Sequence, residues 1–169
     1  LDPTAGSGTG SYVAYAGRLS PEKGITTLVD AWQALKQPIP LKIAGSGQLS
    51  EQVETLARAI PFVSYEGWLA ESELISLLQN ARFMVLPSVW KELQPIIVLQ
   101  ALACGTPIVM SDACAAVDEI VSSGAGVAFR SGDVDSLANT SQELFFDVPR
   151  LLQMRLAARE LFVSRFTAN

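Results

Sequence analysis

The chain has 169 residues, of which 49% are hydrophobic and 17% charged, and this apolar supply suits one globular domain with a sizeable core. Its net charge of −5 argues against a nucleic acid partner, because affinity for a polyanion comes largely from Lys and Arg. The chain has no histidine, which excludes Ser-His-Asp and Cys-His catalysis in their usual form and most zinc sites.

The first half of the chain is predicted to alternate between strands and helices. Residues 1–11 are rich in Gly, Ser and Thr, and we expect them to form a flexible leader or linker. A short apolar run at 12–16 predicts a strand, and apolar residues at three- and four-residue spacing over 23–36 predict a helix. The alternation continues with a strand at 41–44, a helix at 49–60, a strand at 62–65 and a helix at 71–80.

The second half continues this alternation around one distinctive loop. A strand at 83–86 is followed by a loop with the acidic residue Glu92, and an apolar helix then starts near Pro95 and stops at Gly105. The remaining predicted elements are strands at 107–110 and 126–129 and helices at 117–122, 134–146 and 150–165. Six short apolar strands separated by helices predict an α/β fold over residues 12–169, a doubly wound parallel sheet with helices on both faces.

Two loops of this sheet are predicted to meet at one crevice. In the common strand order 3-2-1-4-5-6 the first and fourth strands are neighbours, and open α/β sheets bind ligands where the order reverses. The loop after the first strand, 17–24, carries Arg18 and Lys23, and the loop after the fourth carries Glu92. The helix start near Pro95 adds unpaired N–H groups and a partial positive charge. Together these features predict a site for a diphosphate joined to a sugar.

Several motifs follow one another in order along nearly the whole chain. They are GRLSPEKG (17–24), IAGSG (43–47), VSYEGWL (63–69), PS-x3-E-x7-Q-ALACGTPIV (87–109) and SD-x6-EIV (111–121). This ordered set resembles the retaining glycosyltransferases of family 4, also called group 1, which have the two-domain GT-B fold. The resemblance is to the carboxyl-terminal domain, the Rossmann-like half that binds the nucleotide-sugar donor. It implies that the amino-terminal acceptor domain is absent from this chain.

The resemblance also implies a reaction. A hexose would move from a nucleoside diphosphate sugar, such as a UDP- or GDP-hexose, to an acceptor hydroxyl with the anomeric configuration retained. It implies no cofactor and no metal requirement, because basic side chains neutralise the diphosphate. Since the acceptor half and the closure between the halves are missing, we expect this chain alone to have no transferase activity.

Three residues match catalytic positions of that family. Arg18 and Lys23 correspond to the pair that neutralises the departing diphosphate, on which negative charge builds as the glycosidic bond breaks. Glu92 corresponds to the first glutamate of the family's E-x7-E motif, which contacts the donor sugar. The other donor-binding residues implied by the resemblance are Gly17, Gly45, Trp68, Leu69, Pro95, Ile96, Ile97 and Gln100.

Some of these residues carry a more specific expectation. The backbone N–H groups of Ile96 and Ile97 match positions that hold phosphate or sugar oxygens, while their side chains are predicted to pack in the core. Trp68 and Leu69 fall where the family reads the base. The tryptophan side chain is equally compatible with stacking on a base and with a core or interface position.

The chain departs from the family pattern at three places. Gln100 stands where a second glutamate usually grips the ribose hydroxyls, and a charge-assisted hydrogen bond is roughly twice as strong as a neutral one. We therefore expect weaker donor binding. Ala115-Ala116 replaces a frequent glycine pair and Leu93-Gln94 replaces a frequent Gly-Phe, so the added Cβ atoms are expected to crowd a ligand.

Two other interpretations stay open. Gln100 is compatible with a non-catalytic, degenerate nucleotide-sugar-binding module. The strand at 41–44, Gly45-x-Gly47 and Glu66 also resemble a dinucleotide-binding fingerprint, although Ser50 occupies the third glycine position and the unit is not the first βαβ of the domain.

The sequence also bears on location. Cys104 and Cys114 are predicted to be reduced thiols, since disulfides are rare in the cytosol. No apolar run reaches the ~20 residues of a membrane-spanning helix, and no signal peptide is visible. We therefore expect a cytoplasmic protein, in which any peripheral contact with the inner face of the membrane would belong to the missing half.

Overall fold

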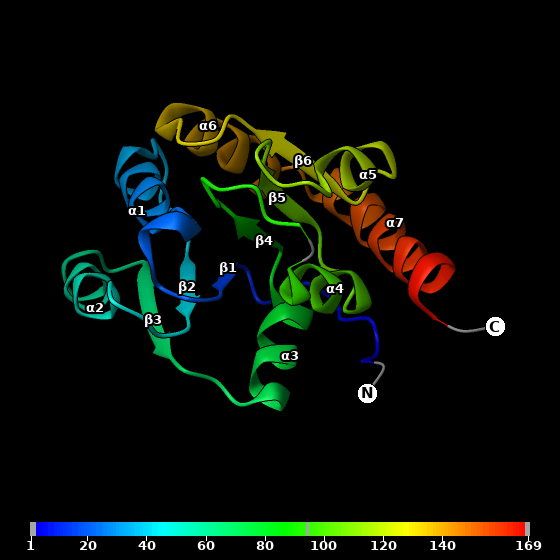
Figure 1. The fold of residues 1–169 in the computed structure, drawn as a ribbon, viewed down its shortest axis with the longest axis horizontal. Coiled ribbons are helices and arrows are strands. Elements are labelled where there is room, and N and C mark those ends of the chain that lie inside the picture. Colours follow the sequence, from blue (N-terminus) through cyan, green and yellow to red (C-terminus); the bar gives the residue numbers. More distant parts are fainter. Residues whose placement is uncertain (1–2, 94, 168–169) are drawn as a thin grey trace.

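The computed structural model describes residues 3–93 and 95–167, so the prediction for Gln94 lies outside the described residues. Six parallel strands form one sheet in the order β3-β2-β1-β4-β5-β6 (Figure 1). The strands are β1 (Val13–Ala16), β2 (Leu41–Ala44), β3 (Val63–Gly67), β4 (Phe83–Leu86), β5 (Ile108–Ser111) and β6 (Gly126–Phe129). The predicted doubly wound parallel sheet and its strand order are confirmed.

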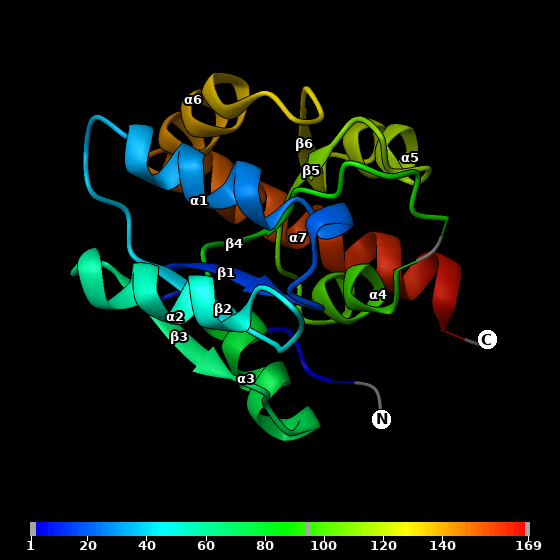
Figure 2. The same ribbon diagram turned by 60° about the vertical axis from the view of Figure 1, so that its left-hand side comes forward.

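Helices cover both faces of the sheet. They are the 3₁₀ turn η1 (Pro21–Lys23), α1 (Ile25–Ala34), α2 (Ser50–Ala59), α3 (Glu71–Asn80), α4 (Ile96–Ala103), α5 (Val117–Ser122), α6 (Val134–Phe145) and α7 (Val148–Phe166). Buried side chains form two main hydrophobic cores: the first includes residues of α1, α2 and α6, and the second includes residues of α3, α4 and α5. Figures 1 and 2 show how these helices are arranged about the sheet. The long helix α7 joins both cores, through Leu151 and Met154 in the first and Ala158 in the second. Within the described part of the chain, no helix is long and apolar enough to cross a membrane.

The central strands are almost entirely apolar because both of their faces are covered. Val13 and Tyr15 of β1 point into the first core, whereas Met84 and Leu86 of β4 point into the second. Every residue of β1, β4 and β5 is buried. Continuous apolar runs of this kind are the pattern expected of parallel strands packed between two helical layers.

The helix predicted over 23–36 is divided at Gly24. Pro21 begins the short turn η1, and Gly24 follows it with a φ of 76°. In this left-handed conformation, which favours glycine, the chain changes direction before α1 begins. Lys23 is therefore carried on a turn of its own at the edge of the sheet.

Residues 3–10 dock against the carboxyl-terminal ends of α3 and α4 (Figure 1). Gly6 donates its N–H to the carbonyl of Cys104 at 2.8 Å, and Gly8 donates to the carbonyl of Gln79 at 3.0 Å. The carbonyl groups at a helix end have no partner within their own helix, so this segment supplies donors where they are needed. Composition predicts a flexible leader here, and it gives no sign of these pairings because the donors are backbone groups.

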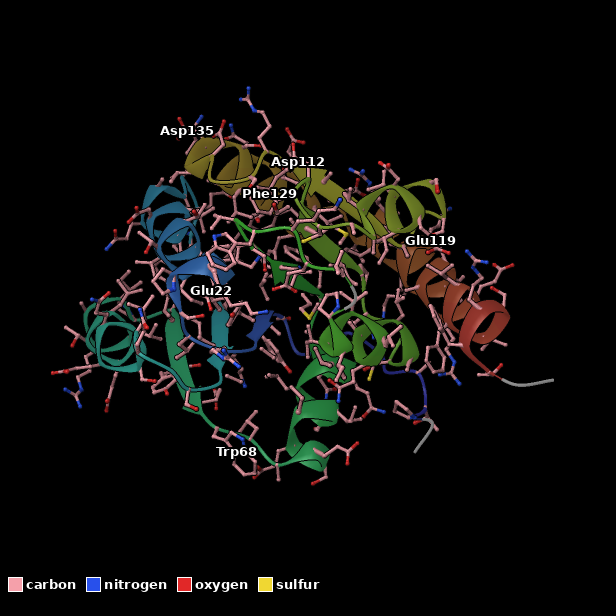
Figure 3. The ribbon with its side chains drawn as sticks, in the orientation of Figure 1. Glu22, Trp68, Asp112, Glu119, Phe129 and Asp135 are labelled. Atoms are coloured by element: carbon pink, nitrogen blue, oxygen red, sulfur yellow. The ribbon has the colours of Figure 1, made fainter. Side chains whose placement is uncertain are left out.

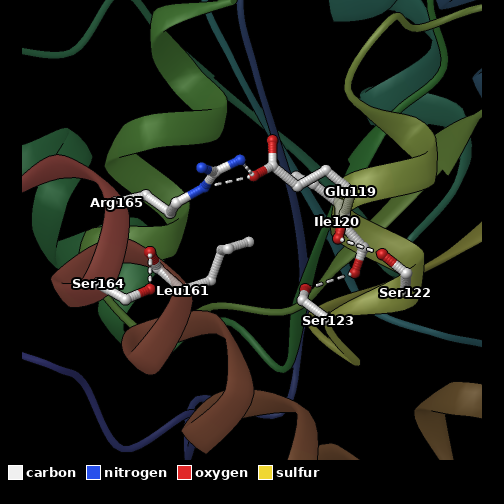
Figure 4. Close-up of polar contacts among 7 residues, drawn as sticks. All are labelled: Glu119, Ile120, Ser122, Ser123, Leu161, Ser164 and Arg165. Atoms are coloured by element: carbon white, nitrogen blue, oxygen red, sulfur yellow. Dashed lines mark hydrogen bonds and ion pairs between the residues drawn. The ribbon is translucent and has the colours of Figure 1, made fainter.

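The carboxyl-terminal end of α7 is tied to α5. Arg165 donates its Nε–H to Oε1 of Glu119 at 2.8 Å (Figure 4). Leu161 of α7 lies between the two helices and lines a cavity of about 210 Å³ together with Ile120 of α5. This contact holds the last turns of α7 beside α5.

The two cysteines are expected to be unreactive in the folded chain. Cys104 and Cys114 are free and buried, and burial raises the pKa of each thiol to about 11. Because the thiolate is the reactive form, only about one thiol in a thousand is ionised at pH 8. We expect iodoacetamide at pH 8 to modify both cysteines of the urea-unfolded chain and neither cysteine of the folded chain in the same time, as measured by intact mass. Equal labelling of the two states would contradict this burial.

Candidate functional site

The candidate site lies at the carboxyl-terminal edge of the sheet, where β1 and β4 are neighbours. The loop 17–24 leaves β1 at this edge, and the loop with Glu92 leaves β4 beside it. Figure 3 shows Glu22 on the first of these loops and Trp68 on the segment that leads from β3 to α3. The two loops that the sequence predicts to share a crevice are therefore adjacent.

Two adjoining cavities open along this edge. One has a volume of about 360 Å³ and the other about 460 Å³, and both are lined by Ala16, Gly17 and Ile97. Every residue predicted for the site lines one or both of them. The first cavity is lined by Gly17, Arg18, Gly45, Trp68, Leu69, Ile97 and Gln100, and the second by Gly17, Lys23, Glu92, Pro95, Ile96 and Ile97. A ligand that extends from one cavity into the other past these shared residues can therefore reach both loops.

An ion pair lies in the second cavity. The ammonium group of Lys23 pairs with Oε1 of Glu92, and Ser88 Oγ donates a hydrogen bond to the same oxygen at 2.8 Å. The Lys23 side chain is 30% exposed and that of Glu92 only 12%, so the carboxylate is the less accessible partner. Ser88 is fully buried, and sequence reasoning did not assign it to the site. Its position directly after β4, in the PS-x3-E motif, is the signal that could have found it.

A buried tyrosine holds the backbone at Arg18. Arg18 is exposed and lines the first cavity. The Tyr15 hydroxyl donates a hydrogen bond to the backbone carbonyl of Arg18 at 2.8 Å. Burial raises the pKa of Tyr15 above its ordinary range, and the Glu92 and Glu22 carboxylates raise it further. The phenol therefore stays protonated and remains a donor at neutral pH. This second contact was also missed, because the pattern shows Tyr15 only as a core residue of a strand.

Backbone contacts join the two loops into one unit. Val89, in the loop after β4, donates its N–H to the carbonyl of Glu22 at 3.0 Å. Gly24 packs so closely on the same loop that a Cβ at this position would lie 1.8 Å from the carbonyl oxygen of Pro87. The relative placement of the two loops is therefore set by the backbone, and it does not depend on the ion pair alone.

The turn after β2 completes the first cavity. Gly45 has a φ of 130°, and a Cβ there would lie 1.9 Å from the carbonyl oxygen of Gly17. Leu19 donates its N–H to the carbonyl of Ser46 at 3.0 Å. These contacts hold the turns after β1 and β2 together on the side of the cavity away from Glu92.

The amino-terminal end of α4 borders the second cavity. Pro95 precedes the helix in an extended conformation, and the N–H groups of Ile96 and Ile97 belong to the first turn, where no intrahelical acceptor exists. Both side chains were predicted to be in the core: Ile97 is partly buried and packs against core residues while it also lines both cavities, and the prediction is wrong for Ile96, which is 74% exposed. As the first helical residue, Ile96 lies at the mouth of the cavity and beyond the core.

Trp68 is at the mouth of the first cavity, where it is 76% exposed. This exposure excludes the core position that the sequence left open, and it leaves stacking on a base or a place in an interface. Gln100, one turn into α4, lines the same cavity as Arg18 and Trp68.

The alanines that replace the frequent glycine pair do not line either site cavity. Ala115 and Ala116 line the cavity of about 210 Å³ between α4, α5 and α7. Ala115 also donates its N–H to the backbone carbonyl of Glu92 at 2.9 Å, which anchors the loop after β4 on its other side. The crowding expected from these two Cβ atoms therefore falls outside the two site cavities.

The acidic residue of the dinucleotide fingerprint lies elsewhere. Glu66 lines a separate cavity with Tyr12 and Lys42, and its Oε1 accepts a hydrogen bond from Ser64 Oγ at 2.8 Å. The turn with Gly45 lines the first site cavity instead. In a dinucleotide site the glycine turn and the acidic residue hold one ligand, so this separation weighs against that interpretation.

The sequence has clear relatives. A family model for the glycosyl transferases of group 1 matches residues 10–147. The glycogen synthase of Mycobacterium tuberculosis is 30% identical over 158 residues, which cover 90% of this chain and 38% of that protein. A GDP-mannose-dependent monoacylated alpha-(1-6)-phosphatidylinositol monomannoside mannosyltransferase of Corynebacterium glutamicum is 29% identical over 157 residues, covering 87% of this chain and 41% of that protein. The chain therefore spans well under half the length of these relatives.

Solved structures share the fold. HepE of Anabaena, crystallised in complex with UDP, superposes with a TM-score of 0.80 at 21% identity over 92% of this chain and 44% of that one. The sucrose-phosphate synthase of Thermosynechococcus elongatus superposes with a TM-score of 0.81 at 23% identity over 93% of this chain and 42% of that one. At this level of identity the likeness shows that these proteins share the fold of this chain.

Proposed function

The chain belongs to the group 1 glycosyltransferases, and we propose that it is the donor-binding domain of a retaining enzyme in this family. The proposed reaction moves a hexose from a nucleoside diphosphate sugar to an acceptor hydroxyl. One observation carries the proposal: Arg18, Lys23 and the first turn of α4 line two cavities that share a wall. Two cations and a helix start around one gap suit a diphosphate.

The proposed role of the cations follows from the chemistry of bond breaking. As the bond between the sugar and the diphosphate breaks, negative charge grows on the leaving diphosphate. Arg18 would meet this charge from the first cavity and Lys23 from the second, while the N–H groups of Ile96 and Ile97 donate to phosphate oxygens. Groups already oriented toward the developing charge lower the barrier most, because they need no reorganisation during the reaction.

Glu92 is the proposed contact for the hexose. Its carboxylate lines the second cavity beside the start of α4 and is held there by Ser88. A carboxylate at this place can accept hydrogen bonds from sugar hydroxyls and stabilise positive charge near the anomeric carbon. A nucleotide-sugar donor is also consistent with the relatives, since one is named as GDP-mannose-dependent and HepE was crystallised with UDP-glucose.

We also propose that the acceptor-binding half lies outside these 169 residues. The chain covers 38% of the length of the related glycogen synthase, which leaves room for a second domain of similar size. An acceptor must approach the sugar from the open side of the two cavities, and a facing domain would exclude water there. The 169-residue chain is therefore proposed to bind donors without transferring the sugar.

Nucleotide binding provides the test. We expect calorimetric titration to show binding of UDP or GDP, with EDTA present and again with Mg²⁺, and the Kd to rise at least about tenfold in Arg18→Ala or Lys23→Ala. Arg58→Ala is the matched control, because Arg58 lies on α2 with its side chain 75% exposed and pairs with Glu54. Its affinity should equal that of the unaltered chain. Unchanged binding in both site variants would contradict the site.

The same titration, together with a transferase assay of the longer chain, separates the two other interpretations. A chain that binds NAD and neither UDP nor GDP would be a dinucleotide-binding domain. A chain that binds nucleotide sugars, but whose longer form with the acceptor half transfers none of them, would be a non-catalytic module. The second interpretation is favoured by one specific observation, the neutral Gln100 in the lining of the first cavity.

A further inference from the structure

The strongest feature that the proposed function leaves unexplained is that its two key side chains are bound to each other. Lys23, the proposed diphosphate ligand, is paired with Glu92, the proposed sugar ligand. We propose that this pair is a latch that the donor opens and that disfavours the nucleoside diphosphate product. The inference rests on the proposed function and assigns a specificity role to the same site.

The structure indicates which partner moves. Glu92 is held at three points: Oε1 accepts from Ser88, the same oxygen pairs with Lys23, and its backbone carbonyl accepts from Ala115. Loss of the lysine leaves the other two contacts in place. Lys23 has a long, flexible stem and is the more exposed of the pair, so its ammonium group can turn toward a ligand while the carboxylate stays.

Charge then separates two classes of ligand. A diphosphate that enters the cavities takes Lys23 away from Glu92 and leaves a carboxylate, which is 12% exposed, without its cation and close to further negative charge. The hydroxyl groups of an attached hexose can donate hydrogen bonds to that carboxylate and compensate for the lost pair. A bare nucleoside diphosphate has no such groups at this position. The latch therefore weakens binding of the product more than binding of the donor, and its closing assists product release.

A double-mutant cycle tests the latch with UDP and GDP as probes. Glu92→Gln keeps the shape of the side chain and an acceptor for Ser88 but removes the negative charge that pairs with the lysine. We expect it to tighten binding of the bare nucleotide by about tenfold when Lys23 is present. In the Lys23→Ala background the same change removes only the repulsion between the Glu92 carboxylate and the diphosphate, and we expect the nucleotide to bind about threefold more tightly or less. The ratio of these two changes in Kd measures how strongly the Lys23–Glu92 pair opposes nucleotide binding.

Two further measurements sharpen the cycle. Glu22→Gln removes a carboxylate from the loop that carries Lys23 and leaves the Lys23–Glu92 pair intact, so it reports the effect of net charge alone. We expect it to change the Kd by less than about twofold. With UDP-glucose or GDP-mannose as the probe, Glu92→Gln should fail to tighten binding, because the amide keeps one neutral acceptor oxygen, which Ser88 occupies, and the sugar hydroxyls lose the charged carboxylate oxygen. The preference for the nucleotide sugar over the bare nucleotide should therefore fall.

The outcomes distinguish the latch from the site. Equal tightening by Glu92→Gln in both backgrounds, or no tightening with Lys23 present, would overturn the latch while the proposed donor site stands. A correctly folded chain that binds neither UDP nor GDP at millimolar concentration would overturn the proposed function and the latch together. A larger effect in the presence of Lys23 would support both.

Discussion

Replacing Gly24 by alanine is expected to destabilise the folded chain by about 3 kcal/mol or more. The new Cβ would lie 1.8 Å from the carbonyl oxygen of Pro87 and 2.5 Å from its carbonyl carbon, and neither backbone atom can rotate away. The φ of 76° adds a penalty of about 1 kcal/mol for a residue with a side chain. Relief requires η1 and the loop after β4 to move apart. Because that movement also carries Lys23 away from the start of α4, which lines the same cavity, the proposed diphosphate ligands would no longer converge, and affinity for UDP or GDP should fall as well.

Gly132→Ala is the matched control for this prediction. Gly132 has a φ of 74°, almost the same as that of Gly24, but a Cβ built on it would have nothing within 4 Å. We expect a loss of about 1 kcal/mol, the backbone penalty alone. Urea unfolding followed by circular dichroism measures both variants, and the difference isolates the contact with Pro87. Two variants of equal stability would show that the close approach of the loops does not require glycine.

The elements of the fold that local pattern determines were predictable from the sequence. The strand at 83–86 and the helix at 71–80 were predicted at their observed bounds, because the strand is a compact apolar run that ends at a proline and the helix has apolar residues at three- and four-residue spacing. The division at Gly24 was missed, since the close contact that leaves no room for a side chain there is with Pro87, 63 residues further along the chain. The docked segment at 3–10 was missed for a similar reason, because its partners are backbone carbonyls of distant helices.

The candidate site was predictable as a set of residues and only partly as a set of contacts. Arg18, Lys23 and Glu92 stand out because they are charged residues in loops at the carboxyl ends of strands. The pairing of Lys23 with Glu92 could not be derived from the pattern, as it depends on how far two side chains reach across the gap. Ser88 and Tyr15 carry no charge and follow or form apolar strands, so their roles in holding the site are visible only in the structure.

Replacing Arg155 by methionine is expected to destabilise the chain by about 3 kcal/mol. This arginine of α7 is only 8% exposed and caps the carboxyl-terminal end of α3. Its Nη1 donates to the carbonyl of Ala81 and its Nη2 to that of Gln79, each at 3.0 Å. Burial lowers the pKa of the guanidinium, which reflects the desolvation that these bonds must offset. Methionine keeps most of the apolar stem but leaves the carbonyl of Ala81 without this charged donor.

Arg150→Met provides the control, because it makes the same change on an exposed residue of the same helix. We expect its free energy of unfolding to stay within about 0.5 kcal/mol of the unaltered chain. Arg155→Lys should fall between the two, since one ammonium group cannot reproduce the fork that reaches both carbonyls. If Arg155→Met unfolded at the same urea concentration as Arg150→Met, desolvation of the cation would cancel its hydrogen bonds. A large loss would instead show that α7 is anchored by this cap, at the place where α3 and the docked segment at 3–10 also meet.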